Sequence, residues 1–305
     1  MGLKIRRSSL IFPVNVQKFL EKAHLRGADA ISMDLEDSVP PSEKDSARKL
    51  VREAIPMVAR GGGEVMVRVN NDPALICEDV DAVVYPGLDG IHLPKVESAE
   101  QVHRVEALID AKERERGIPQ GTITISARIE TPLGLLHSRA IAEASSRIDC
   151  MGVGPEDYSF ALGVEPSKDG MELLYAVSKV VAICKAMGIM ANGLLGSVAG
   201  FRDLEGFEQA AMRGRQLGTE GASGIHPDQL KILHKVFSPS AESVAHARRV
   251  VQAFEEGLQR GTASVGLDGK MVDVPVYYRA KKIIERADAI EAMERKKAQA
   301  LAQIS

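Results

Sequence analysis

Several short apolar runs in the sequence end in charged residues that could do chemistry. These residues are Asp34, Glu36 and Asp37, then Arg68, Lys95, Arg128 and Glu130, and finally Glu156 and Asp157. Mg²⁺ prefers hard oxygen ligands from one or two carboxylates, with positions left open for water and substrate. The pattern therefore predicts a carboxylate-rich Mg²⁺ site with one or two arginines. A surface turn or a salt bridge at the rim of the fold is the alternative for Asp34–Asp37 and for Arg68.

The residues around Glu130 and Asp157 favour a functional site. Pro132 lies just after Glu130 and stops a strand, which holds the carboxylate at the strand end. Gly152 and Gly154 precede Asp157 and allow the backbone to be approached closely there. Structural pairing of the two carboxylates is the alternative interpretation.

Other catalytic motifs are absent from the sequence. It contains no H-x-x-x-H or Cys/His cluster for zinc, no G-x-S-x-G nucleophile and no G-x-x-x-x-G-K-[ST] phosphate loop. The histidines His92, His103 and His226 are interpreted as structural or surface residues.

The composition is that of an ordinary globular protein. Hydrophobic residues make up 45% of the 305 residues, and the net charge is −3 at pH 7. This balance disfavours a nucleic-acid partner. No apolar run approaches the length of a membrane span, so no membrane association is expected. Three scattered cysteines and no signal-peptide pattern favour a reducing, cytoplasmic location.

Strand-like runs alternate with helix-like stretches along most of the chain. The expected strands are Ser8–Phe12, Ala30–Leu35, Val65–Asn70, Gly90–Pro94, Thr122–Glu130 and Cys150–Gly154, with less regular ones near Ile189–Leu195 and Ser223–His226. The expected helices among them include Val16–Arg26, Ser42–Ala59 and Ser98–Arg114.

This alternation predicts an α/β fold with a parallel sheet and crossover helices. About eight units favour a closed TIM-type (β/α)₈ barrel over an open doubly wound sheet, which is the alternative. In such a barrel the working residues lie at the carboxyl ends of the strands. The charged residues that follow the apolar runs would then meet at one mouth.

The pattern changes near residue 237. Helical spacing returns at Ala241–Gln259, a glycine-marked loop follows at Gly261–Gly269, and Val276–Ile304 is a long amphipathic helix. We therefore predict a TIM-barrel catalytic domain over residues 1–236. Residues 237–305 are predicted to form a C-terminal helical extension or lid.

The motifs together resemble one family, that of the HpcH/HpaI aldolases and citrate lyase β subunits, in its CitE-like branch. The stretches that carry the resemblance run in family order over nearly the whole chain. They are Arg7-Ser-Ser-Leu-Ile-Phe-Pro, Gly27 to Val39, Lys44 to Arg48, Val67-Arg-Val-Asn, Gly87 to Ala99, Ile129-Glu-Thr-Pro-Leu-Gly, Gly154-Pro-Glu-Asp-Tyr, Ile225-His-Pro-Asp-Gln and Lys270-Met-Val-Asp-Val-Pro-Val.

The resemblance implies a modified TIM barrel that assembles as a homotrimer or hexamer, with the C-terminal extension reaching a neighbouring subunit. It implies Mg²⁺ as the cofactor, held by Glu130 and Asp157. By the same resemblance, Arg68 would bind the substrate's keto or hydroxy oxygen, and Asp34, Glu36 and Asp37 would orient Arg68 and metal-bound water. Asp273 would be the acid/base, delivered by an adjacent subunit. The residues that would bind the cofactor portion of the thioester are Arg7, Phe12 and Lys95.

The activity implied by the resemblance is a Mg²⁺-dependent carbon–carbon lyase. Its substrate would be a 3-hydroxyacyl-CoA of the malyl-CoA or citramalyl-CoA type, and its products acetyl-CoA and a 2-keto acid such as glyoxylate or pyruvate. The alternatives are a thioesterase or synthase on the same site, a citrate lyase β subunit acting on a citryl carrier-protein thioester, a CoA-free 2-keto acid aldolase, and a non-catalytic CoA-binding protein.

Two positions depart from the family pattern. Val14 stands where the family has a glycine after its F-x-P motif, and Ala222 stands where it has a lysine. Both positions are expected near the barrel mouth, where they would alter contacts with CoA.

Overall fold

Eight parallel strands form the centre of the computed structural model, which describes residues 3–304. They are β1 (Ser8–Pro13), β2 (Ala30–Asp34), β3 (Glu64–Arg68), β4 (Gly90–Leu93), β5 (Thr124–Ile129), β6 (Ile148–Val153), β7 (Met190–Asn192) and β8 (Ala222–Gly224). The sheet order is β7-β6-β5-β4-β3-β2-β1-β8. Asn192 of β7 bridges Gly221 just before β8 in parallel, so the sheet closes. The barrel prediction is confirmed and the open sheet is excluded.

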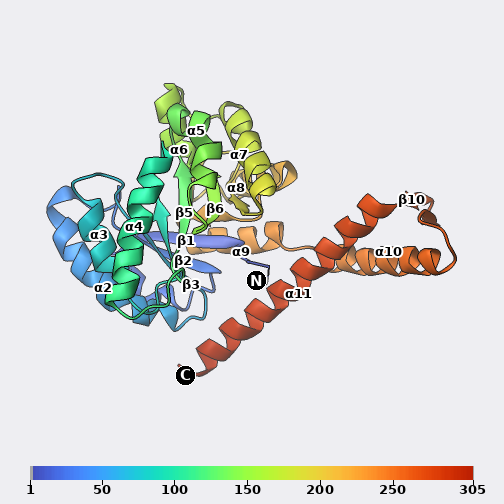
Figure 1. Cartoon of the computed structure of the whole chain (residues 1–305), viewed down its shortest axis with the longest axis horizontal. Coiled ribbons are helices and arrows are strands. Elements are labelled where there is room, and N and C mark those ends of the chain that lie inside the picture. The colour runs from blue at the N-terminus through green and yellow to red at the C-terminus, as the bar shows by residue number, and fades with distance from the viewer. Residues whose placement is uncertain (1–2, 305) are drawn as a thin grey trace.

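Helices cover the outside of this barrel (Figure 1). They are α1 (Gln17–Ala23), α2 (Lys44–Ala59), α3 (Ile76–Val83), α4 (Ala99–Glu115), α5 (Pro132–Glu143), α6 (Pro155–Leu162), α7 (Leu174–Met187), α8 (Leu204–Leu217) and α9 (Pro227–Phe237), with 3₁₀ turns η1 (Pro41–Glu43) and η2 (Met171–Leu173).

Helix α4 illustrates how the sequence specifies these helices. Ser98 begins it with a capping box that includes Gln101, which satisfies backbone donors of the first turn. Val102, Val105 and Ile109 lie on one face at helical spacing and are fully buried.

The barrel interior is polar, whereas the layer between strands and helices is apolar. Ser32 Oγ of β2 and His92 Nδ1 of β4 lie 3.1 Å apart inside the barrel, although β3 runs between their two strands. Ser126 on β5 is also fully buried. Buried polar groups are costly unless they find partners, so a polar interior points to a functional use of this space.

The last part of the chain consists of α10 (Ala241–Gln259), strands β9 (Val265–Leu267) and β10 (Lys270–Val272), and α11 (Val274–Ala302). Residues 241–280, which we call the arm, project away from the barrel, and the second half of α11 returns to it (Figure 1). Lys297 Nζ donates to the carbonyl of Gly27 over 2.9 Å at this contact.

The segment Gly261–Gly269 is not simply a loop, as predicted, because part of it is β9 of an antiparallel hairpin with β10. Asp268 and Gly269 connect the strands with φ of 51° and 73°. Positive φ at both central residues is the geometry that Asp-Gly favours in two-residue hairpin turns. None of the helices within residues 3–304 is long and apolar enough to cross a membrane.

Candidate active site

Asp34 and Arg68 lie side by side at the carboxyl ends of β2 and β3. Arg68 donates from Nε and Nη2 to the two Asp34 oxygens, each over 2.7 Å, and its Nη1 lies 2.9 Å from Glu36 Oε2. Burial works to raise the pKa of Asp34, but the hydrogen bonds and charge of Arg68 outweigh it and lower that pKa. Asp34 is therefore a fixed anion that sets the plane of the guanidinium.

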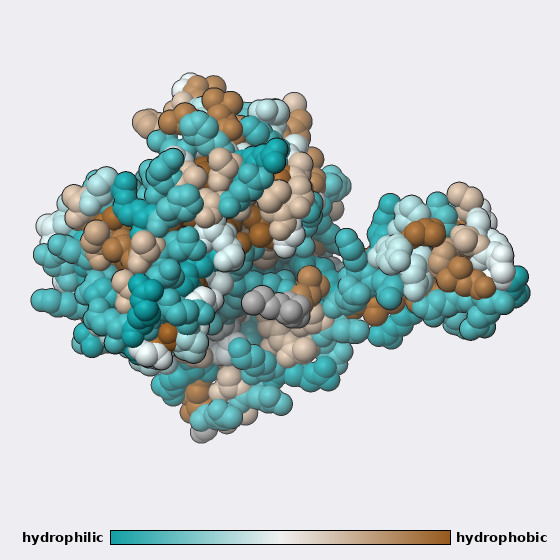
Figure 2. Space-filling view, viewed as in Figure 1, coloured by the Kyte–Doolittle hydropathy of each residue, from teal (hydrophilic) through white to brown (hydrophobic). Residues whose placement is uncertain are grey.

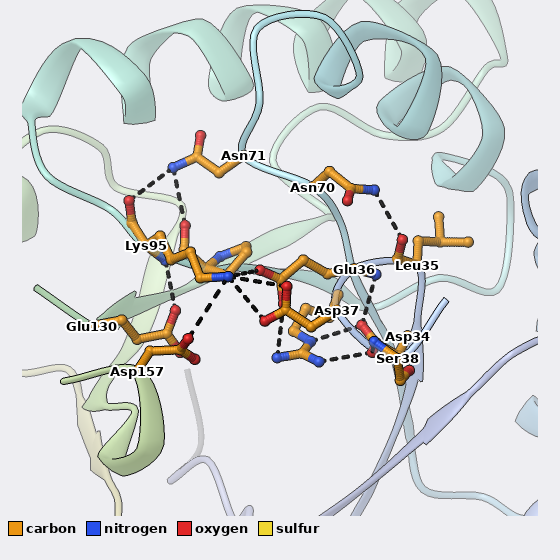
Figure 3. A network of polar contacts seen from close by, with 12 residues as sticks. Asp34, Leu35, Glu36, Asp37, Ser38, Asn70, Asn71, Lys95, Glu130 and Asp157 are labelled. Atoms are coloured by element: carbon orange, nitrogen blue, oxygen red, sulfur yellow. Dashed lines mark hydrogen bonds and ion pairs between the residues drawn. The ribbon is translucent and has the colours of Figure 1, made fainter. Parts of the chain in front are cut away.

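Lys95 connects this pair to Glu130 and Asp157, the two carboxylates predicted to hold the metal (Figure 3). Its ammonium lies 2.6 Å from Glu36 Oε1, 2.9 Å from Asp37 Oδ2 and 3.9 Å from Asp157 Oδ1. Its backbone N–H donates to Glu130 Oε2 over 2.8 Å. The backbone of Lys95 has φ +49°, which is uncommon outside glycine. This strained conformation aims the N–H and the side chain at two different carboxylates.

Glu130 follows the last residue of β5, and Thr131 behind it caps α5 by accepting a hydrogen bond from the Gly134 N–H. The Glu130 side chain is 5% exposed. Burial, and next the charge of Asp157, raise the pKa of Glu130 to about 7. A divalent cation bound there would offset both the desolvation of Glu130 and the negative charge of Asp157 beside it.

Asp157 lies in the first turn of α6, directly after β6. Gly154, the residue before this helix, lets Glu130 approach, because a Cβ at Gly154 would lie 2.3 Å from Glu130 Oε1. The φ of Gly154 is −87°, so the requirement for glycine is one of space rather than of backbone conformation. The predicted proximity of Glu130 and Asp157 thus depends on a glycine between them.

A cavity of about 130 Å³ opens at this mouth. Its lining includes the predicted residues Arg68, Glu130 and Asp157. It also includes Arg128, which the sequence analysis named as a candidate without a specific role, and His92 and Asn192, to which it gave no role in binding or catalysis. Arg128 lies on β5, two positions before Glu130, which directly follows that strand, and this period of two was the available signal that both face the interior.

Arg7 and Phe12 lie apart from the cavity lining. Arg7 precedes β1 at the amino ends of the strands, where its Nε donates to Asp29 Oδ2 over 2.8 Å. Phe12 lies on β1 with its ring 6.2 Å from that of Phe19 of α1, and its neighbour Ile11 lines the cavity instead. Of the three residues assigned to the thioester cofactor, Lys95 contacts the carboxylates at the mouth, Phe12 lies near the mouth end of β1, and Arg7 lies at the opposite end of the barrel.

A second group of metal-type side chains, Asp29, His234 and Glu294, lies at the amino ends of the strands with ligand atoms within 4.8 Å of one another. Two cations already occupy this group. Arg7 contacts both Asp29 and Glu294, and Lys297 Nζ lies 2.9 Å from Asp29 Oδ1. A divalent ion would be repelled by both, so the group fits a structural ion cluster that anchors α11.

Asp273 is the residue at which α11 begins. This start of α11 belongs to the arm, which projects away from the barrel (Figure 1). The Asp273 side chain caps the helix by accepting a hydrogen bond from the Val276 N–H over 3.3 Å. Val14 follows β1 on the mouth side but is fully buried. Ala222 was expected near the mouth, and this is wrong: it pairs with Ser8 at the amino end of β1 and is fully buried.

The comparisons with known proteins agree on the family. A family model described as HpcH/HpaI aldolase/citrate lyase matches residues 7–227. The citrate lyase subunit beta of Leuconostoc mesenteroides is 38% identical over 94% of this chain and 94% of its own length. The L-malyl-CoA/beta-methylmalyl-CoA lyase of Cereibacter sphaeroides is 33% identical over 94% of this chain and 96% of its own length.

A solved structure supports the same relationship. The CitE protein of Mycobacterium tuberculosis, crystallised with magnesium, acetoacetate and coenzyme A, superposes with a TM-score of 0.71 and 26% identity, over 92% of this chain and 97% of that one. The chain belongs to the HpcH/HpaI aldolase/citrate lyase family and is an enzyme of its citrate lyase β-like and malyl-CoA lyase-like group.

Proposed function

We propose that the protein is a Mg²⁺-dependent carbon–carbon lyase that cleaves a 3-hydroxyacyl thioester of the malyl-CoA or citramalyl-CoA type to acetyl-CoA and a 2-keto acid. The observation that carries this proposal is the convergence of Glu130, Asp157 and Arg68 on one cavity. Relatives with citrate lyase and malyl-CoA lyase names support the same reaction class.

Glu130 and Asp157 would hold the metal. The raised pKa of Glu130, about 7, fits such a role. A cation bound there would offset both the cost of burying the Glu130 charge and the repulsion from Asp157. Bound Mg²⁺ would stabilise negative charge on the carboxylate and neighbouring oxygen of the keto acid. Carboxylate ligands that leave open positions for substrate match the preference of this ion.

Arg68 would donate to the substrate oxygen that becomes negative as the C–C bond forms or breaks. Its guanidinium is held in one plane by Asp34 and is partly exposed to the cavity. In the cleavage direction the substrate hydroxyl would give its proton to water at the mouth, its carbon would become the keto carbon, and the electrons of the broken C–C bond would move to the thioester side as an enolate. Asp273 in its acid form would give its proton to the enolate carbon to yield acetyl-CoA, and the proton released from the hydroxyl would return Asp273 to the acid form.

We also propose that the arm delivers Asp273 to the mouth of a neighbouring subunit in a homo-oligomer. Apolar side chains near the arm tip are open to solvent, including Met271 at 67% and Tyr278 at 58% exposure, and Figure 2 shows brown surface on the arm. Helix α6, which carries Asp157, exposes Phe160 at 85%. Exposed apolar patches of this kind mark interaction surfaces.

The first experiment is a turnover assay with Mg²⁺ and malyl-CoA, β-methylmalyl-CoA and citramalyl-CoA, in which keto acid and free thiol are followed separately. Keto acid without free thiol supports the lyase. Free thiol without keto acid would instead identify a thioesterase. If neither appears although Mg²⁺ binds, the remaining substrates are a carrier-protein thioester or a free keto acid.

Mixed oligomers test the shared site. Glu130→Gln and Asp273→Asn subunits are each expected to be inactive alone. Co-expression of the two is expected to restore activity, because some sites then combine an intact Glu130 with an intact Asp273 from the neighbour. If the mixture stays inactive although mixed oligomers form, each site is built from a single subunit and Asp273 is not shared.

A further inference from the structure

A second cavity lies at the base of the arm, on the opposite side of the barrel from the mouth. Its volume is about 250 Å³. The lining includes Glu220, just before β8, and Phe237, at the end of α9, so the cavity lies at the amino ends of the strands. It also includes Pro239, just before the arm, and Arg279, near the end of the arm. The two cavities share no lining residue.

Four cations line this cavity, one from α8 of the barrel and three from α11. They are Arg215, Arg279, Lys282 and Arg286. The three on α11 recur at spacings of three and four residues, so they lie on one face of the helix. Like charges at these spacings destabilise a helix, and here they face a further cation on the barrel. A fold that gathers them in one cavity is expected to have a use for them.

Little negative charge balances this group. None of the four cations forms an ion pair with a carboxylate of residues 3–304. The lining includes one carboxylate, Glu220, whose Oε2 lies 2.6 Å from Lys185 Nζ. Burial is the largest effect on Arg286 and lowers its pKa, and the charge of Glu220 opposes this. The charges of Arg7 and Arg215 lower that pKa further.

Two of the guanidiniums are held in place by neutral backbone carbonyls. Arg286 Nη2 donates to the carbonyl of Glu220 over 2.6 Å and to that of Phe237 over 3.0 Å. Arg215 Nη1 donates to the carbonyl of Val236 over 2.6 Å. These contacts fix the positions of the cations without cancelling their charge. Arginines held in this way present their remaining N–H groups in a fork that matches the oxygens of an anion.

The other two cations are free to close on a ligand. The side chains of Arg279 and Lys282 are exposed and form no hydrogen bond with any described residue. An anion in the cavity would therefore meet two fixed guanidiniums and two adaptable cations. It would also lie between α11 and the barrel and so bridge positive charges that otherwise repel one another.

We propose that this cavity binds a small anion with two adjacent phosphate groups, namely inorganic pyrophosphate or the diphosphate of a nucleotide. Four cations and one carboxylate give the lining a net charge of +3. A phosphate group carries about −1.5 to −2 charges at pH 7, so two adjacent groups match this charge better than one. The site is separate from the proposed active site, and it would bind its anion whether or not the chain is a lyase.

Calorimetric titration of the full chain with inorganic pyrophosphate, in metal-free buffer at low ionic strength, tests this site. Lys282→Gln is expected to bind pyrophosphate about 10-fold more weakly than the wild type, the range of a hydrogen bond to a charged group. Lys281→Gln is the matched control, because Lys281 is the preceding residue of α11 and is exposed but does not line the cavity. It is expected to bind pyrophosphate like the wild type.

Two results would overturn the proposal. One is a wild type that does not bind pyrophosphate. The other is an equal weakening in Lys281→Gln and Lys282→Gln, because a diffuse positive surface and not a defined site would then attract the anion. Competition with ADP separates the two sources of the ligand. Displacement of pyrophosphate by ADP supports a nucleotide, and retention of pyrophosphate supports the inorganic anion.

A stability measurement excludes a merely structural role for Lys282. Without ligand, Lys282→Gln is expected to melt at the wild-type temperature or above it, because one of several like charges has been removed. Pyrophosphate is expected to raise the melting temperature of the wild type and of Lys281→Gln more than that of Lys282→Gln. A lower melting temperature of ligand-free Lys282→Gln, or an equal rise in all three proteins, would contradict the proposal.

Discussion

Replacement of Glu130 by glutamine gives a sharp test of how the metal site is built. Glu130 is almost fully buried, and burial followed by the charge of Asp157 raises its pKa from 4.5 to about 7. One pKa unit corresponds to about 1.4 kcal/mol, so an ionised Glu130 destabilises the metal-free fold by about 3 kcal/mol. Glutamine keeps the shape and the contact with the Lys95 N–H but carries no charge.

The direction of the pKa shift determines how the stability of the metal-free protein changes with pH. The folded state holds a proton on Glu130 between pH 4.5 and 7 that the unfolded state has already lost. The stability of the metal-free wild type therefore falls as pH rises through this window, and the fall is complete above pH 7. Glu130→Gln is expected to be more stable than the wild type at pH 8 by about 3 kcal/mol, and this gain shrinks to below about 1 kcal/mol at pH 5.

Urea denaturation in the presence of a chelator, at pH 5 and pH 8, measures these differences. Addition of Mg²⁺ at pH 8 is expected to stabilise the wild type and not Glu130→Gln, since a ligand of the folded state raises its stability. The exposed Glu165→Gln serves as the control. A gain that is the same at both pH values, or no gain at pH 8, would refute the electrostatic account of the Glu130 and Asp157 pair.

Three further variants test other parts of the site. Arg68→Lys keeps the positive charge but loses the two-point contact of the guanidinium with Asp34. We expect kcat/KM to fall by about 100-fold or more while Mg²⁺ binding persists. Unchanged turnover would remove Arg68 from the reaction. Gly154→Ala is expected to displace Glu130 and abolish Mg²⁺-dependent thermal stabilisation, whereas Gly266→Ala, which meets no atom within 4 Å, leaves it unchanged. Asp29→Asn is expected to destabilise the fold at neutral pH. Burial opposes ionisation of Asp29, but its cation partners lower its pKa, so the stability that it contributes is complete above about pH 4 and is lost as pH falls further. The difference in the free energy of unfolding between wild type and Asp29→Asn, measured by urea denaturation, should therefore narrow only in strong acid. A difference that stays constant as pH falls would contradict this.

Much of the fold was accessible from the sequence because the relevant interactions are local. Alternating apolar strands and amphipathic helices repeat about eight times, and only a parallel sheet with crossover helices accommodates that order. The ends of Ala241–Gln259 were predicted to the residue, since Ser240 caps the helix by a local hydrogen bond. Asp34, Arg68, Glu130 and Asp157 were chosen as candidates because each lies at or after the end of an apolar strand, and carboxyl ends of parallel strands share one mouth. The structure places Arg68, Glu130 and Asp157 in the lining of one cavity.

The remaining features depend on contacts between residues far apart in the chain. The sequence left a closed barrel and an open sheet as alternatives, and the bridge between Asn192 and Gly221 decides between them. Arg7 belongs to a strong family motif, yet whether it faces a ligand or Asp29 depends on which end of the barrel receives α11.

Arg128 shows the same limit most clearly. Its position on a strand was readable, but its neutral hydrogen-bond partners Asn192 and Ser223 come from strands far along the chain. Gly152 leaves the space that the guanidinium fills, and Asn192 and His92 each have a buried nitrogen without a hydrogen-bond partner among the described residues. These three residues come from three different strands. Local sequence determines where a side chain starts, and only the tertiary structure determines what surrounds its far end.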